Sequence, residues 1–346
     1  MTPASTPEGP VGEIDRLARA ALTKLADAGD PQVAALVGQF GAAPVVDLIR
    51  GGLRGGAWSG WSEQAIAQID PAADLEQAER QGIRFIIPAD EEWPQQLAAL
   101  DQCSPQHDRG GVPLGLWIKG DQPLAEVTRA AVTVDGSRSA SPYGAEHARS
   151  ISADLSAQQM TIVSGAAFGI DQSAHRGALA AEGLTVAVLA CGVDRAYPAA
   201  HADLLATIGQ RGLIVSECAP GTTPSRTRFL ARSRITAALS EGTVVVEAAQ
   251  RSGALNTARW SNELHRPVMG VPGPVSSITS EGVHGLVRAG QATMVTSAED
   301  IIEDLGARPM ASGAELDADS HRTRRGRPLV QRPIPGLKEN RQPPSR

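Results

Sequence analysis

The chain has 346 residues, of which 42% are hydrophobic and 3% aromatic, and its formal net charge is −6 at pH 7. This length leaves room for two or three domains with a sizeable core. Three widely spaced cysteines and seven scattered histidines argue against a disulfide framework and against a metal site. We expect a cytoplasmic protein, because the N-terminus lacks a basic patch followed by an apolar run and no stretch of about 18 apolar residues occurs.

The first 80 residues show a helical pattern. Within residues 12–80, apolar residues recur at three- and four-residue steps and are interrupted by Gly and Pro. We therefore expect a small helical (SAM-like) domain over residues 1–80. A connector follows over residues 81–129, with two predicted edge strands at 83–87 and 114–118.

From residue 130 onward, short apolar runs alternate with helical patterns. The predicted strands are 132–135, 161–164, 185–190, 213–216, 243–247 and 267–271. The predicted helices are 143–158, 169–182, 201–211, 228–240, 254–265 and 297–305. This alternation predicts an α/β fold over residues 130–306, with an extended Rossmann-like, doubly wound and mostly parallel sheet.

The C-terminal residues 307–346 are rich in Gly, Pro, Arg and Asp, and their lack of periodicity predicts a disordered basic tail. Residues 321–346 hold eight Lys or Arg and one acid, a net charge of +7, which leaves −13 for residues 1–320. The overall negative charge does not exclude a polyanionic partner, because an acidic protein can bind one through a local basic groove.

Glycine and hydroxyl residues follow nearly every predicted strand of the main sheet. The first strand leads into Gly136, Ser137 and Arg138, and the second into the segment 164–171. In an open parallel sheet, ligands bind outside the carboxyl ends of the strands, where such turns bring backbone N–H groups close to phosphate oxygens. The spacing matches neither a dinucleotide fingerprint nor an NTPase P-loop, so we expect no cofactor.

A row of arginines occupies residues 226–234. Arg228 and Arg232 are four residues apart, which places them on one face of a helix. Arg232 and Arg234 point to different sides, so we expect at least one of them to be structural, bonded to a carbonyl or to an acid such as Glu217 or Glu247. Several arginines beside several anion-cradling turns suit an extended phosphate backbone better than one small ligand.

These segments together resemble the bacterial DNA-processing protein A family (DprA, also called Smf). The resemblance covers about residues 83–302. Its motifs include Gly-Ser-Arg at 136–138, Ser-Gly at 164–165 with Gly-Ile-Asp at 169–171, Phe-x-x-Arg-x-Arg at 229–234 and Ser-Gly-Ala-Leu at 252–255. It implies a non-enzymatic protein that binds single-stranded DNA, forms a homodimer and loads RecA recombinase during natural transformation.

The resemblance also implies site residues. Those expected at the DNA are Ser137, Arg138, Ser164, Gly165, Gly169, Arg226, Arg228 and Arg232. Those expected to be structural are Gly136, Asp171, Arg234, Glu247 and Gly253.

Several features depart from the family pattern, among them Gly-Val-His at 282–284 where the family often has Gly-Thr-Asn. Asp135 stands where a glycine is usual, and a carboxylate there is unfavourable beside phosphate unless it points away. Leu230 replaces a proline and Ser233 an asparagine, so we expect a looser turn around them. The chain ends in a basic tail where many members carry a winged-helix domain.

An enzymatic alternative stays open, namely a Rossmann-like nucleotide phosphoribohydrolase of the lysine-decarboxylase-like family. That family carries a Pro-Gly-Gly-x-Gly-Thr signature where this chain has Ser-Gly-Ala-Leu-Asn-Thr at 252–257. The glycine-rich loop is therefore only half present, and a catalytic arginine–glutamate pair is not evident.

Overall fold

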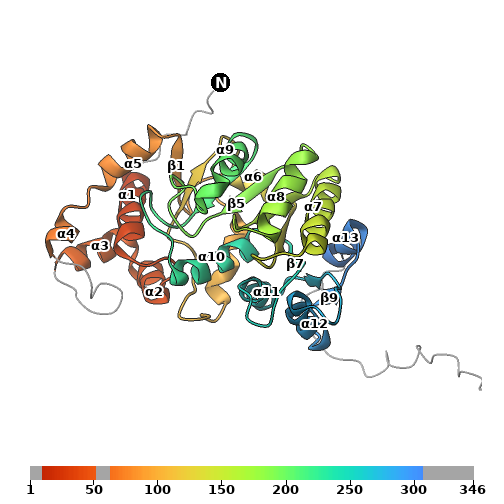
Figure 1. Ribbon diagram of the computed structural model, residues 1–346. Helices are drawn as coiled ribbons and strands as arrows, with labels where there is room; N and C mark the ends of the chain where they lie inside the picture. Colours follow the sequence, from red (N-terminus) through yellow and green to blue (C-terminus); the bar gives the residue numbers. More distant parts are fainter. Residues whose placement is uncertain (1–9, 52–62, 307–346) are drawn as a thin grey trace, which may run out of the picture. The chain divides into compact units, whose positions relative to one another are not determined.

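A computed structural model describes residues 10–51 and 63–306 of the chain. The chain divides into two units, 1–308 and 309–346, and only the first contains described residues. The predicted disordered tail lies outside the described residues. Figure 1 shows the arrangement of the helices and strands.

The described residues of the N-terminal region form five helices, two of which begin at an aspartate cap. They are α1 (Pro10–Leu25), α2 (Pro31–Phe40), α3 (Ala42–Arg50), α4 (Glu63–Ala67) and α5 (Pro71–Glu79). Asp30 caps α2 by accepting hydrogen bonds from the backbone N–H groups of Gln32 and Val33, and Asp70 caps α5 in the same way. Each cap precedes a proline at the first helical position, where the missing N–H costs nothing. Residues 18–49 contribute a common apolar core to this helical module.

The connector adds two antiparallel strands to the edge of the main sheet. Strand β1 (Ile83–Ile86) pairs with β2 (Leu116–Lys119), and β2 pairs with β6 (Leu213–Ser216). Between and after these strands lie a 3-10 helix, η2 (Gln95–Gln102), and α6 (Leu124–Val127), neither of which the sequence pattern predicted.

One nine-stranded sheet organises the fold, in the order β1-β2-β6-β5-β4-β3-β7-β8-β9. All pairs from β6 to β9 are parallel. The parallel part of the sheet starts in the middle with β3, continues outward to β6 and then resumes with β7 on the other side of β3. The remaining strands are β3 (Ala131–Asp135), β4 (Thr161–Ser164), β5 (Thr185–Val188), β7 (Gly242–Val245), β8 (Val268–Gly270) and β9 (Thr293–Met294). The predicted mostly parallel α/β sheet is confirmed.

Helices cover both faces of this sheet. Adjacent residues of β4 show the two layers: Val163 packs in a core with α10 and α11, whereas Ile162 packs in a core with α7, α8 and α13. The helices are α7 (Pro142–Ala157), α8 (Ile170–Ala180), α9 (Ala202–Arg211), α10 (Arg226–Ala238), α11 (Ala254–Glu263), α12 (Glu281–Arg288) and α13 (Ala298–Gly306). Strands β5 and β7 end two residues earlier than expected, and α10 begins two residues earlier, because Ser225 caps it.

Within the described ranges, no single helix is long and apolar enough to cross a membrane. Only α2 and α3 taken together have enough apolar length, and they are bent by 114° at their junction.

Candidate nucleic-acid interface

Hydrogen bonds to buried groups hold the turn after β3, and only the tip of the turn is exposed. The Asp135 carboxylate accepts hydrogen bonds from the Gly136 N–H at 2.7 Å and from the Thr257 hydroxyl at 2.6 Å, and the residue is 4% exposed. The carboxylate therefore points into the protein, away from the surface where a phosphate would lie. The Ser137 N–H donates to the Glu247 carbonyl at 2.7 Å, and Arg138 is exposed beyond it.

Glu247 holds this turn to the start of α7. Its carboxylate accepts hydrogen bonds from the Ser141 N–H at 2.9 Å, the Ser141 hydroxyl at 2.6 Å and the Thr279 hydroxyl at 3.1 Å. Ser141 in turn caps α7 through the Gly144 N–H. A side chain at Gly144 would collide with the Glu247 carboxylate. These contacts link the end of the β7 segment to the start of α7.

The turn after β4 buries all three of its residues that were predicted to meet DNA. Ser164, Gly165 and Gly169 are buried, and the Ser164 hydroxyl donates to the Val134 carbonyl at 2.6 Å. Gly169 adopts a φ of +81° and packs against the Ser137 carbonyl, a position that accepts no side chain. The exposed part of this turn is Phe168, which is 47% exposed.

A buried carboxyl group lies beneath this turn. Asp171, in the first turn of α8, accepts a hydrogen bond from the Ala167 N–H at 3.1 Å. Burial, reinforced by the nearby Asp135 carboxylate, raises the pKa of Asp171 to about 7, while Arg232 acts in the opposite direction. Burial also lowers the pKa of the neighbouring His175 to about 4, so its imidazole is neutral at pH 7. Asp171 thus contacts the turn after β4 from inside the protein.

The ends of β3, β4 and β5 surround a cavity of about 180 Å³, which we call the strand-end hollow. Two arginines and three aromatic rings line it: Arg138, Arg232, Phe168, Tyr197 and Phe229. The Arg138 guanidinium carbon lies 4.6 Å from the centroid of the Phe229 ring, and that of Arg232 lies 5.6 Å away. The Tyr197 and Phe229 rings are 5.9 Å apart.

The two arginines of the strand-end hollow lie near the buried Asp171, because both of their charges act to lower its pKa. Neither forms an ion pair with any residue that the structure describes. The Nε atom of Arg232 is buried and has no hydrogen-bond partner among the described residues. Unpaired cations beside aromatic rings suit phosphates and stacked bases of a single strand.

The other arginines of α10 do not join this hollow. Arg234 is fully buried and makes two hydrogen bonds to Glu217, at 2.8 and 2.6 Å. Arg228 donates to the Thr223 carbonyl at 2.6 Å and lies 3.7 Å from Asp27 of the helical module. Arg226 is exposed at the start of the helix. The expectation that one of Arg232 and Arg234 bonds Glu217 is confirmed, but Arg228 and Arg232 face different cavities.

The looser turn expected around Leu230 and Ser233 is wrong, because both residues lie inside α10. Leucine, unlike proline, has a backbone N–H and no ring to obstruct the preceding turn, so the helix extends toward its Ser225 cap. The buried Ser233 hydroxyl donates to the Phe229 carbonyl at 3.4 Å, a bond within the helix.

The remaining predicted structural residues lie at close approaches or helix starts. A side chain at Gly136 would collide with Ile170 and with the Glu247 carbonyl, so glycine is required there. Gly253 is the residue before α11 and makes no side-chain cap.

Sequence reasoning missed the aromatic part of the strand-end hollow. Phe168 and Tyr197 were visible as aromatic residues in turns after successive strands, in a chain with only 3% aromatics. Among the described residues, no group of three His, Cys, Asp or Glu side chains is placed to hold a metal ion.

The fold and the hollow define a Rossmann-like α/β protein with a cationic, aromatic-lined site at its strand ends. The family model described as DNA recombination-mediator protein A matches residues 84–306, and the chain belongs to this family. The resemblance found in the sequence is thereby confirmed, and the chain is a DNA processing protein.

Two relatives show the extent of the similarity. A DNA processing protein DprA of Mycobacterium tuberculosis is 45% identical over 298 residues, which cover 85% of this chain and 76% of that protein. A protein Smf of Escherichia coli is 40% identical over 223 residues, which cover 64% of this chain and 56% of that protein.

Two solved structures are also similar. DprA from Streptococcus pneumoniae superimposes with a TM-score of 0.67 at 29% identity, covering 84% of this chain and 97% of that one. DprA from Helicobacter pylori, whose structure concerns its single-stranded DNA binding mode, gives a TM-score of 0.54 at 26% identity, covering 64% and 95%.

Proposed function

We propose that the chain binds single-stranded DNA at the strand-end hollow and acts as a recombination mediator that protects incoming DNA and loads RecA during natural transformation. The observation that carries this proposal is that Arg138 and Arg232 lie beside the Phe229 ring and form no ion pair with any described residue. The single-stranded DNA binding mode described for the Helicobacter pylori protein supports it.

The proposed binding is largely independent of base sequence. Guanidinium groups attract the phosphates, and the rings of Phe168, Tyr197 and Phe229 offer stacking surfaces to any base. Single strands are favoured because their bases are free to stack on these rings, whereas duplex bases are already stacked on one another.

We further propose that the protein is not an enzyme. Glu247, the carboxylate at the end of the β7 segment, is hydrogen-bonded to Ser141 and Thr279 and serves the turn after β3. A mononucleotide turnover assay tests the phosphoribohydrolase alternative, and release of a free base would contradict our proposal.

RecA partnership, dimerisation and a cytosolic location belong to the same proposal. They are what membership of the family leads us to expect, and the three free cysteines suit a reducing compartment. RecA filament formation on protein-bound single strands and sedimentation of the free protein test the first two.

The main test is fluorescence anisotropy with a labelled oligo-dT, at two salt concentrations and with duplex competitor. We expect Arg138→Ala to weaken binding by about 1–3 kcal/mol, the range for hydrogen bonds to charged groups. Arg176→Ala is the matched control, because it removes one exposed charge from the middle of α8. A wild type that binds no single strands at low salt would overturn the proposal.

A further inference from the structure

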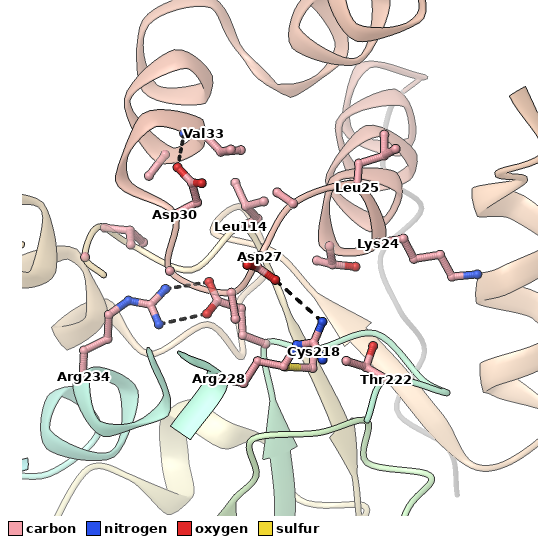
Figure 2. A pocket seen from close by; sticks show the side chains of 18 residues that line it. Lys24, Leu25, Asp27, Asp30, Val33, Leu114, Cys218, Thr222, Arg228 and Arg234 are labelled. Atoms are coloured by element: carbon pink, nitrogen blue, oxygen red, sulfur yellow. Dashed lines mark hydrogen bonds and ion pairs between the residues drawn. The ribbon is translucent and has the colours of Figure 1, made fainter. Parts of the chain in front are cut away.

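A second cavity, of about 240 Å³, lies between the loop joining α1 to α2 and the start of α10. Figure 2 shows its lining, and we call it the module crevice because one wall is the helical module. Arg228 and Arg234 enter it from α10, and Asp27 enters it from the loop. The crevice therefore joins the helical module to the helix that also supplies Arg232 to the strand-end hollow.

Arg234 fixes the loop in place. Besides its two bonds to Glu217, its Nε donates to the Gly111 carbonyl at 3.0 Å. Gly29 of the loop has a φ of +67°, and a Cβ there would lie 3.1 Å from the Arg234 guanidinium carbon. The Gly110 N–H donates to the Gly29 carbonyl at 2.9 Å. The loop is thus packed against a buried ion pair and tied to the connector.

The fixed loop presents Asp27 to Arg228. One Asp27 oxygen lies 3.7 Å from Arg228 Nη2, and the other lies 3.7 Å from Arg109 Nη2. The Arg228 side chain is 26% exposed and that of Asp27 is 50% exposed. The pair is therefore in contact with solvent, and a phosphate can reach the same guanidinium.

We propose that Asp27 sets the affinity for single-stranded DNA by occupying Arg228, so that a backbone phosphate must displace the carboxylate before it gains this cation. The inference rests on the proposed function and adds the helical module to the interface, as an element that weakens binding. Its physical basis is competition, since a carboxylate and a phosphate offer the same kind of acceptor to one guanidinium and repel each other.

Asp27→Asn tests the proposal, with Asp47→Asn as the control. Asp47 is an exposed residue of α3, so both changes remove one negative charge from the helical module. In oligo-dT anisotropy at low salt, we expect Asp27→Asn to bind about two- to five-fold more tightly than wild type, the scale of an exposed ion pair. The slope of log affinity against log salt should steepen by about 0.7, the value for one additional phosphate contact on a single strand.

Testing Asp27→Asn in the Arg228→Ala background separates competition for Arg228 from a general effect of charge. There, Asp27→Asn should bring no gain, because the cation that it releases is missing. Asp27→Glu, which keeps the carboxylate, should bind like wild type.

Two results would overturn the inference while leaving single-strand binding intact. One is equal affinity of wild type and Asp27→Asn. The other is a gain that persists in the Arg228→Ala background, which would assign the effect to Arg109 or to total charge. A wild type that does not bind at all would instead refute the proposed function.

Discussion

The strand-end hollow and the module crevice are both lined by arginines from α10, but the arginines differ in whether they form ion pairs. In the module crevice, Arg234 is buried against Glu217 and Arg228 lies near Asp27. In the strand-end hollow, Arg138 and Arg232 lie over the Phe229 ring, and neither is paired with an acid in the described part of the chain. A paired arginine serves the fold or is restrained, whereas an unpaired arginine is available to a ligand.

The same comparison explains why a row of arginines in the sequence does not define one site. Arg232 and Arg234 are two residues apart, and the helix directs them toward different surroundings. Their roles differ because Arg234 forms an ion pair and Arg232 does not: Glu217, which follows the end of another strand, pairs with Arg234. The two cavities can therefore be tested separately.

The largest expected effect is on the buried pair of the module crevice. Glu217→Gln leaves the Arg234 charge buried without a counter-charge, since Arg234 is fully buried and Glu217 is 7% exposed. We expect a loss of about 3–5 kcal/mol in the free energy of unfolding, measured by urea denaturation.

The control is Glu146→Gln, which removes the partner of Arg149 from an exposed pair on α7. Solvent takes over the interactions of an exposed pair, so no measurable loss is expected there. Equal stabilities of the two variants would show that the buried pair contributes no more than a surface one.

The turn after β3 was predictable because its signals are local. A valine-rich strand ends just before Gly136, and the helix that follows begins at Pro142, one residue before its predicted start. The sheet followed in the same way from the alternation of strands and helices. Asp135 needed the structure, because the hydroxyl that holds its carboxylate belongs to Thr257, far along the chain.

The contents of the two cavities were less predictable. Phe168 and Tyr197 of the strand-end hollow come from turns after different strands and Phe229 comes from α10, and only the packing of these elements brings them together. The pairing of Asp27 with Arg228 joins the helical module to α10, and neither periodicity nor residue spacing in the sequence predicts that contact. Contacts between distant segments are decided by packing.

The next effect concerns the buried carboxyl group of Asp171, beneath the turn after β4, and depends on pH. Burial raises the pKa of Asp171 to about 7, above the usual value of about 3.9. The folded state therefore holds this proton more tightly than the unfolded state does. Stability from protonated Asp171 is fully present below about pH 4 and is lost as the pH rises through about 7.

Asp171→Asn, which carries no charge, should remove this pH dependence. We expect its stability relative to wild type to rise by about 1–3 kcal/mol between pH 5 and pH 8, measured by urea denaturation at both values. Asp154→Asn, at an exposed site on α7, is the control and should show no such change. A constant difference between Asp171→Asn and wild type would mean that Asp171 is ionised throughout.

The smallest expected effect separates stacking from charge at the rim of the strand-end hollow. Phe168 is 47% exposed and meets His201 edge-on, with ring centroids 4.6 Å apart. Phe168→Ala should weaken oligo-dT binding by about 1 kcal/mol, at the low end for base stacking, and leave the salt slope unchanged. Arg138→Ala should lower that slope by about 0.7, because it removes a phosphate contact.

Phe40→Ala is the matched control for the ring, since Phe40 is 50% exposed but belongs to the helical module. An unchanged affinity for Phe168→Ala would restrict the interface to charge and remove the aromatic rim from it. A changed salt slope would instead show that the ring acts by placing the turn after β4. Only a loss of affinity with an unchanged salt slope shows that Phe168 stacks on a base. The two cavities would then differ in their exposed residues, because Phe168 strengthens DNA binding at the strand-end hollow whereas Asp27 weakens it at the module crevice.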